Sequence, residues 1–297
     1  MKEYRFIKDY KNNDELRHSF SKLAIETFGI DFEPWYKRGF WKENYICYSF
    51  DYDNEIVANV SVNYLDVVIG EEVIRAIQLG TVMSDEAHRG QGLVRRLMEK
   101  VLDDHRDKYE LIYLFANKNV LEFYPKFGFV HVNEMEFSME LDKSNFKICE
   151  NKNESNMRKL NLDNEEDLSI ILRLTSNRNP ISKTISVLND KYLLLFYCIY
   201  VFRNDIYYLE EEDCIVLYKV TEDTLKLFDI ITENDINVEK VIEKVIDTGI
   251  KHIEFQFTPD NKIGEIIKKQ SEDDQLFVIS KGIKLPEEFV FPKLSHA

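Results

Sequence analysis

Residues 78–98 (QLGTVMSDEAHRGQGLVRRLM) constrain the fold more than any other part of the sequence. A strand-like segment runs into a short polar turn, and Arg89, Gly90 and Gly92 then open an amphipathic helix. The first turn of a helix presents unpaired N–H groups and the positive end of the helix dipole. Glycines let an anion approach the backbone, and Arg89 adds a positive charge. The segment therefore predicts a phosphate or pyrophosphate site on a strand–turn–helix unit.

Two common phosphate-binding motifs do not describe this turn. A P-loop would continue with Gly-Lys-Ser/Thr, which is absent. A dinucleotide-binding fingerprint would carry further glycines and follow a parallel strand, whereas the preceding segments predict an antiparallel meander.

The first half of the chain predicts alternating strands and helices. Strands are expected over residues 2–8, 45–52, 55–69, 72–84, 110–116 and 129–141. Helices are expected over residues 15–28, with Asp14 as cap, and over 31–41, 91–107 and 118–127, because apolar residues recur there at helical spacing.

The second half predicts the same order of elements with different residues. Helices are expected over residues 164–176, 237–248 and 260–270, and strands over 192–202, 206–210, 213–220, 224–232, 251–257 and 275–280. Residues 192–202 (YLLLFYCIYVF) are apolar on all sides, which favours a strand buried on both faces. The repeated order indicates a duplicated α/β architecture: a domain over residues 1–142, a polar linker over 143–160, and a second domain over 161–297.

A second motif lies downstream of the glycine-containing turn. Its letters are Asn117-x-x-Val120-x-x-Phe123-Tyr124-x-x-x-Gly128-Phe129. Together with the Arg89-Gly90-Gln91-Gly92 turn, it resembles the paired motifs of the GCN5-related N-acetyltransferase (GNAT) family, over about residues 1–141. The resemblance implies a mixed sheet flanked by helices, and the two halves are then two GNAT-like domains.

The resemblance also implies a cofactor site for acetyl-CoA. In it, the backbone of Arg89, Gly90, Gln91, Gly92, Leu93, Val94 and Arg95 would hold the pyrophosphate. Val82, Met83 and Ser84 would pair with the pantetheine arm, and Asn117 would contact it. Tyr124 would be the catalytic acid that protonates the leaving thiolate. Val94 departs from the family pattern, which has a small residue at that position.

The amine acceptor and the base are less well defined by the sequence. Asp31, Glu33, Trp35 and Tyr36 combine acidic and aromatic side chains, which suits a cationic amine; alternatively, the aromatic residues belong to the core of a short helix. The base is a carboxylate or a chain of waters. Residues 291–297 carry apolar anchors and can dock near the site, where a terminal carboxylate would serve as the base.

The second half lacks the features that bind a pyrophosphate. Its counterpart of the glycine-containing turn, residues 232–238, has no Gly or Arg and carries Glu233 and Asp235. Two carboxylates repel an anion, so this half is expected to be a degenerate GNAT-like domain that shapes the acceptor cleft.

The net charge and the cysteine pattern argue against several other classes of protein. Lys and Arg total 39 and Asp and Glu total 54, a formal charge of -15, which argues against nucleic acid and anionic membranes as partners. The longest apolar run, residues 192–202, is too short to span a membrane.

The cysteines Cys47, Cys149, Cys198 and Cys214 form no C-x-x-C pair and have no His at ligand spacing. This pattern predicts reduced thiols, no metal site and a cytoplasmic location.

The sequence thus predicts an acetyl-CoA-dependent N-acetyltransferase that transfers the acetyl group directly to a primary amine. The alternatives are a catalytically silent CoA-binding sensor and a transferase that uses another acyl-CoA. Whether the protein is a monomer or a homodimer stays open.

Overall fold

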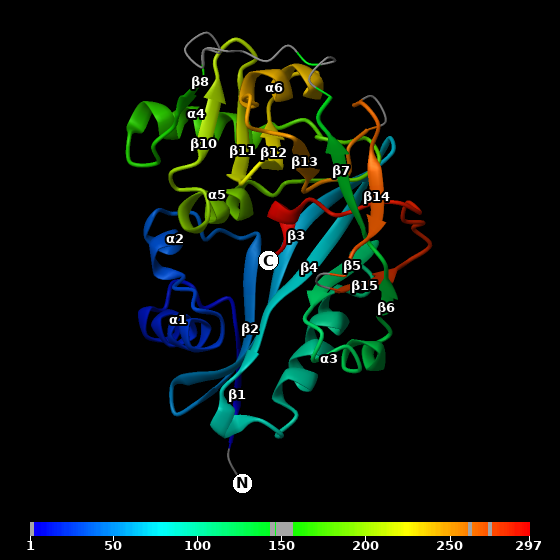
Figure 1. The fold of residues 1–297 in the computed structure, drawn as a ribbon. Coiled ribbons are helices and arrows are strands. Elements are labelled where there is room, and N and C mark those ends of the chain that lie inside the picture. Colours follow the sequence, from blue (N-terminus) through cyan, green and yellow to red (C-terminus); the bar gives the residue numbers. More distant parts are fainter. Residues whose placement is uncertain (1–2, 143–145, 147–156, 261–262, 273–274) are drawn as a thin grey trace.

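The computed structural model describes residues 3–142, 146, 157–260, 263–272 and 275–297. Two mixed β-sheets, each flanked by helices, form a lower and an upper lobe (Figure 1). The first sheet has the strand order β1-β2-β3-β4-β5-β15-β6, with β9 paired to β3, and the second has the order β14-β7-β13-β12-β11-β10-β8. The predicted fold class, an α/β protein with mixed sheets, is confirmed.

The elements have the following bounds. The first sheet contains β1 (Arg5–Lys8), β2 (Tyr45–Tyr52), β3 (Glu55–Ile69), β4 (Glu72–Ser84), β5 (Leu111–Ala116), β6 (Val130–Val132), β9 (Ser186–Leu188) and β15 (Gln275–Ser280). The second contains β7 (Met135–Glu140), β8 (Met157–Lys159), β10 (Ile206–Leu209), β11 (Cys214–Thr221), β12 (Thr224–Ile231), β13 (His252–Phe255) and β14 (Ile267–Gln270). The helices are α1 (Asp14–Phe28), α2 (Glu33–Lys37), α3 (Leu93–His105), α4 (Glu165–Ser176), α5 (Lys191–Tyr200) and α6 (Val238–Val245), with 3₁₀ turns η1 (Glu86–His88), η2 (Tyr124–Phe127) and η4 (Lys293–Ser295).

Helix ends follow local chemistry. The side chain of Asn13, not the expected Asp14, caps α1 by accepting a hydrogen bond from the Leu16 N–H at 3.1 Å. The helix ends at Gly29, which adopts the left-handed conformation. Helix α3 buries Leu97 and Met98 against the first sheet, as its apolar spacing predicts.

The two sheets exchange strands across the boundary expected near residues 143–160. Strand β15, from the second half, lies antiparallel between β5 and β6 of the first sheet (Figure 1). Strand β7, from the first half, lies between β13 and β14 of the second sheet. Within the expected linker, residues 143–145 and 147–156 lie outside the described part of the chain.

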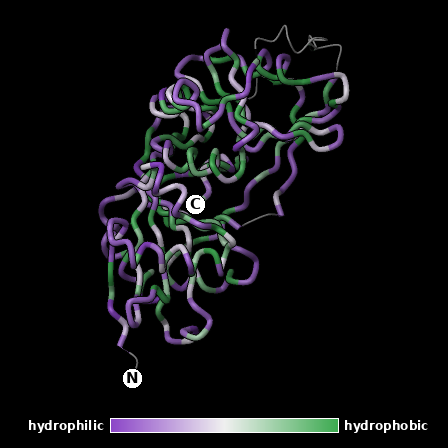
Figure 2. The backbone as a smooth tube through the Cα atoms, turned by 90° about the vertical axis from the view of Figure 1, so that its left-hand side faces the viewer, coloured by the Kyte–Doolittle hydropathy of each residue, from purple (hydrophilic) through white to green (hydrophobic). Residues whose placement is uncertain are grey.

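The lobes also share hydrophobic contacts. One buried cluster joins Phe32 and Trp35 from the first half to Leu194 and Leu294 from the second. A second joins residues of β3 and β4 to β9, β15 and Phe289. In Figure 2, hydrophobic stretches run through the interior of both lobes and hydrophilic stretches lie at many of the outer turns.

Three expected elements are wrong. Of residues 192–202, those up to Tyr200 belong to helix α5 rather than to a strand, because residues all around the helix axis find apolar neighbours. In place of a helix over 118–127 there is a turn, in which the Asn117 side chain accepts from the Asn119 N–H at 3.0 Å, followed by η2, which starts next to Pro125. Residues 267–270 form β14, which pairs with β7, rather than part of a helix over 260–270.

A buried charged cluster lies between α4, α5 and β12. Both terminal nitrogens of Arg178 donate to the Asp229 carboxylate at 2.7 and 2.8 Å, and Asp190 lies 3.5 Å from the same guanidinium. All three side chains are buried. Burial raises the pKa of Asp190 to about 6, against the opposing effect of Arg178.

We expect Phe277→Ala in β15 to lower the free energy of unfolding by about 3–5 kcal/mol, because the ring is buried in the first sheet. Both tryptophans lie in the first half, so their fluorescence in a urea titration reports on that half. Val130→Ala in the neighbouring β6 is the control, since its side chain is 64% exposed. An unchanged fluorescence midpoint in Phe277→Ala would contradict the strand exchange.

We expect the two carboxylates beside Arg178 to differ in their effect on stability. Asp229→Asn leaves the buried guanidinium without its main partner and costs about 3–5 kcal/mol. Asp190 has a raised pKa, so its contribution to stability is complete below its unfolded pKa and is lost as the pH rises through about 6. Asp190→Asn therefore costs much less at pH 7 and flattens the pH dependence between 4 and 6, measured by urea unfolding with circular dichroism. Equal losses at pH 7 would contradict this assignment.

Candidate active site

The site begins where two central strands separate. Strand β4 pairs in parallel with β5 only through Ala76, Ile77 and Gln78, although β4 continues to Ser84. Beyond this pairing lies a cavity of about 390 Å³, here called the donor cavity. It is lined by the following residues: Thr27, Phe28, Leu79, Gly80, Thr81, Val82, Met83, Ser84, Arg89, Val94, Leu114, Phe115, Ala116, Asn117, Val120, Phe123, Tyr124 and Ala297.

A β-bulge shapes the wall of the donor cavity. On β3, Ser61 pairs with Gly80 and Asn59 pairs with Met83, so Thr81 and Val82 bulge from β4. Thr81 has a φ of 47°, which is strained for a β-branched residue. The buried Asn59 amide supports the bulge by donating to the Thr81 carbonyl at 2.9 Å and to the Ser61 hydroxyl at 2.8 Å. The bulge thus takes residues 81–82 out of regular pairing with β3 and leaves them beside the cavity.

The glycine-containing turn forms the outer end of this site. A cavity of about 360 Å³ is lined by Ser84, His88, Arg89, Gly90, Gln91, Gly92, Leu93, Val94, Arg95 and Phe123. Gly90 and Gly92 have φ values of 75° and 71°, which glycine adopts without strain. Gly92 caps α3 without a side-chain hydrogen bond, and the first turn of α3 carries no acidic residue. No side chain therefore caps the N–H groups at the start of α3, which is the arrangement that an anion site requires.

Tyr124 lies at the inner end of the donor cavity, at the start of η2. Its side chain is buried, and burial raises the pKa of the phenol to about 12. The phenol is therefore protonated at neutral pH, as a proton donor must be. Asn117 lines the same cavity, where it closes the turn that follows β5.

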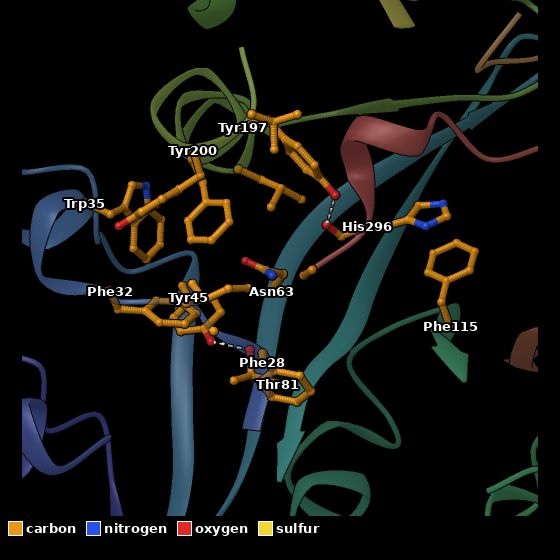
Figure 3. Close-up of a pocket in the computed structure, with 16 residues that line it drawn as sticks. Phe28, Phe32, Trp35, Tyr45, Asn63, Thr81, Phe115, Tyr197, Tyr200 and His296 are labelled. Carbon is orange, nitrogen blue, oxygen red and sulfur yellow. Dashed lines mark hydrogen bonds between the residues drawn. The ribbon is translucent and has the colours of Figure 1, made fainter. Parts of the chain in front are cut away.

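A second and larger cavity, of about 550 Å³, adjoins the donor cavity; we call it the aromatic cavity (Figure 3). It is lined by Phe28, Gly29, Ile30, Phe32, Trp35, Tyr45, Asn63, Thr81, Phe115, Leu193, Phe196, Tyr197, Tyr200, Val201, His296 and Ala297. The two cavities share Phe28, Thr81, Phe115 and Ala297. A molecule in one cavity can therefore meet a molecule in the other beside β4.

The structure brings only part of the expected acceptor set to this cavity. Trp35 lines it, whereas Asp31, Glu33 and Tyr36 do not. The Glu33 carboxylate accepts from Arg17 Nε at 2.6 Å, and the Arg17 guanidinium also lies 3.7 Å from the Tyr36 ring centre. The Asp31 carboxylate accepts from the Glu33 N–H at 3.0 Å.

Helix α5 supplies cavity residues that sequence reasoning missed. Leu193, Phe196, Tyr197 and Tyr200 have the spacing i, i+3, i+4 and i+7, which places them on one face of a helix. That spacing is readable in the sequence, but the run is apolar at every position and was assigned to a strand. Asn63, Thr81 and Phe115 carry no comparable signal, because their relation depends on strand register.

Residues 291–297 dock at the junction of the two cavities, as expected. The Tyr197 hydroxyl donates to the His296 carbonyl at 2.7 Å, and the His296 ring stacks on Phe115 with ring centres 3.5 Å apart (Figure 3). Burial lowers the pKa of His296 well below its usual value, so its ring is neutral. The Ala297 backbone lies where a side chain on residue 80 would start: its carbonyl oxygen is 2.5 Å from the ideal Cβ position on Gly80. Glycine is therefore required at position 80 for this docking.

The corresponding turn in the second half has its helix end already satisfied. The Asn237 side chain caps α6 by accepting from the Lys240 N–H, and Glu239 lies in the first turn. Both features disfavour an anion there, in line with the expectation that this half does not bind a pyrophosphate.

The described ranges hold no sign of a metal site or of a membrane-spanning helix. In these ranges no group of three or more His, Cys, Asp or Glu side chains is arranged to hold a metal ion. No helix of the described residues is long and apolar enough to cross a membrane. Cys47, Cys198 and Cys214 are free and buried, and burial raises the pKa of each to about 12; Cys149 lies outside the described residues.

Comparison with known proteins agrees with this geometry. Residues 11–132 match the family model of the acetyltransferase (GNAT) domain. No curated protein matches the chain. Among solved structures, a conserved protein of unknown function from Enterococcus faecalis V583 has a TM-score of 0.62 at 13% identity, covering 94% of this chain and 73% of that one.

Two further structures share the fold at similar levels. A GCN5-related N-acetyltransferase from Kribbella flavida has a TM-score of 0.57 at 12% identity, covering 94% of this chain and 72% of that one. Eis1 from Mycobacterium abscessus has a TM-score of 0.57 at 12% identity, covering 94% of this chain and 74% of that one. Both halves of the chain therefore have counterparts in known GNAT-fold proteins.

Residues 11–132 thus match the acetyltransferase (GNAT) domain, and the chain as a whole shares its fold with these solved structures. Members of this family generally use acetyl-CoA.

We expect Gly92→Glu to abolish stabilisation by acetyl-CoA, because a carboxylate at the first turn of α3 repels the pyrophosphate. A ligand at 100 times its Kd adds ~2.7 kcal/mol to the folded state, which raises the Tm of the wild type by several degrees. Gly70→Glu, in the turn between β3 and β4, is the matched control, since Gly70 has a φ of 63° and no atom near its Cβ position. A full shift in Gly92→Glu would place the cofactor elsewhere.

Proposed function

We propose that the protein is an acetyl-CoA-dependent N-acetyltransferase that passes the acetyl group directly to a primary amine. The observation that carries this proposal is the path from the turn at Gly90 and Gly92, along the bulge at Thr81, to Tyr124 and the adjoining aromatic cavity. This path has an anion site at one end, a proton donor near the middle and space for a second molecule at the other end.

The donor would bind along this path. Backbone N–H groups of Arg89, Gly90, Gln91, Gly92, Leu93, Val94 and Arg95 would hold the pyrophosphate, with Arg89 adding charge. The pantetheine arm would follow Val82, Met83 and Ser84 as an added strand, because no described strand pairs with β4 there on the β5 side. Asn117 would contact the arm from the other side of the gap.

The reaction would then proceed in one ternary complex. The amine nitrogen forms a bond to the thioester carbonyl carbon, and backbone N–H groups of the bulge stabilise the negative charge on the oxygen. As the C–S bond breaks, the Tyr124 phenol gives its proton to the sulfur, and the proton released by the amine passes to solvent, which reprotonates Tyr124. The products are the acetylated amine and CoA.

Direct transfer is favoured over an acyl-enzyme. None of the described cysteines lines the donor cavity, and burial keeps all three as thiols, which are poor nucleophiles. The acetyl group would therefore pass to the amine without resting on the protein.

We expect Tyr124→Phe to lower kcat by about 10²–10⁴-fold while the Kd for acetyl-CoA is unchanged. The assay follows CoA thiol release from acetyl-CoA with a panel of primary amines, and isothermal titration gives the Kd. Because the pKa of Tyr124 is raised to about 12, its ionisation does not lower the wild-type rate between pH 7 and 10.

Tyr207→Phe is the matched control for this experiment, because Tyr207 lies on β10 in the upper lobe and lines neither cavity. Unchanged turnover in Tyr124→Phe would remove Tyr124 as the acid. If the wild type binds acetyl-CoA but acetylates no amine in the panel, the result would favour the alternative function, a catalytically silent CoA-binding sensor.

A further inference from the structure

We propose that the acceptor is a primary amine joined by a short aliphatic chain to an aromatic ring, and that the aromatic cavity holds the ring. This proposal rests on the proposed function and adds the substrate class.

The cavity is enclosed by aromatic rings from separate parts of the chain. Phe32 and Trp35 come from the region of α2, Tyr45 from β2, and Tyr200 from α5 (Figure 3). Helix α5 also supplies Phe196. The Phe196 ring lies 5.5 Å from the centre of Phe32 and 5.8 Å from that of Trp35, with the Trp35 pair edge to face. A ring placed here would find edges and faces at the distances that aromatic pairs prefer.

The hydroxyl and indole N–H groups of these aromatic side chains already form hydrogen bonds within the protein. The Tyr45 hydroxyl bonds the Thr81 hydroxyl at 2.7 Å, and Trp35 Nε1 donates to the Tyr192 carbonyl at 3.0 Å. The Tyr200 hydroxyl donates to the Asp31 carbonyl. With these bonds made, the side chains offer the cavity their apolar rings rather than hydrogen-bonding groups.

The lining also disfavours acceptors with several charges or hydroxyls. Of the described residues around the cavity, none has an Asp, Glu, Lys or Arg side chain, and the His296 ring is neutral; the Ala297 backbone lies at the junction with the donor cavity, where it faces the reacting amine. A second ammonium group would lose its hydration without an ionic partner. Two side-chain nitrogens on residues that line the cavity, Asn63 Nδ2 and His296 Nε2, are buried without a hydrogen-bond partner, so a ligand can form a hydrogen bond with each, but the many hydroxyls of a polyol cannot be satisfied.

The position of the cavity sets the direction of the ligand. Its junction with the donor cavity lies at Thr81 and Phe115, where the thioester would be, whereas Trp35 and Tyr200 lie toward α2 and α5 (Figure 3). The Phe196 ring lies beside both of them. An amine at the junction and a ring toward Phe196 require a short linker between them. A volume of about 550 Å³ accommodates such a molecule. Ring faces also attract the ammonium form as it enters.

The test compares four amines with acetyl-CoA as donor: 2-phenylethylamine, tryptamine, n-butylamine and spermidine. We expect kcat/KM for the two aromatic amines to exceed that for n-butylamine by about tenfold or more, through burial of the ring, and that for spermidine by a larger factor.

Phe196→Ala connects this preference to the cavity. We expect it to raise the KM for 2-phenylethylamine about tenfold, with a small change for n-butylamine and an unchanged Kd for acetyl-CoA. Phe228→Ala is the matched control, because Phe228 is a half-buried ring on β12 that packs on Phe202 and lines neither cavity.

A second variant adds a charge with little risk to folding. Val201 lines the cavity but is 40% exposed, so Val201→Glu places a carboxylate at its edge without burying it. We expect this variant to lower the KM for spermidine relative to 2-phenylethylamine several-fold, because it supplies the missing ionic partner.

The outcomes separate this proposal from the proposed function. If spermidine is acetylated as efficiently as 2-phenylethylamine, or if Phe196→Ala leaves the KM for 2-phenylethylamine unchanged, the proposed acceptor class is wrong. The proposed acetyltransferase activity is unaffected by either result. If turnover is faster with octanoyl-CoA than with acetyl-CoA, and Phe196→Ala reverses this order, the aromatic cavity binds the acyl chain. That result also contradicts the proposed acceptor class. No stabilisation by acetyl-CoA contradicts the proposed function itself.

Discussion

The antiparallel pairing of β15 with β5 and β6 is the constraint on which the rest of the structure depends. It satisfies the free edge of β5 along its whole length, while β5 keeps only a short parallel contact with β4. The separation of β4 from β5, and hence the donor cavity, is tolerated because β5 is held firmly from the other side. The reciprocal placement of β7 in the second sheet ties the lobes together through backbone hydrogen bonds, not only through side-chain contacts.

The aromatic cavity forms where the two halves of the chain meet. Its walls come from α2, β2 and β5 of the first half and from α5 and the residues near His296 in the second. The second half carries no anion site of its own at the turn before α6, yet it contributes most of one wall of the cavity through α5. The second half can thus contribute to the site without an anion site of its own, because it encloses part of the space beside the donor cavity.

Local chemistry was readable from the sequence, and long-range pairing was not. The turn at Gly90 and Gly92 and the apolar face of α3 follow from spacing and glycine conformation, and the sequence placed them correctly. Helix α5 was misassigned because a run that is apolar at every position fits a buried strand or a buried helix equally well. The insertion of β15 has no local signature, since the apolar run from Leu276 to Ile279 predicts a strand but not the strands with which it pairs. The aromatic cavity depends on both of these features, so of its lining only Trp35 and the docked residues at 296 and 297 were expected.

The insertion of β15 also sets the order in which the protein can form. Strand β6 pairs with β15 and with no other described strand. It therefore cannot join a sheet until residues 275–280, which lie nearly half a chain length further on, have been synthesised. Contacts between residues so far apart in sequence are slow to form, because the loop between them must close first. Until then the edge of β5 that β15 will cover is open to other strands. Newly made chains are therefore exposed to mispairing at this edge for longer than a GNAT domain built from one continuous segment.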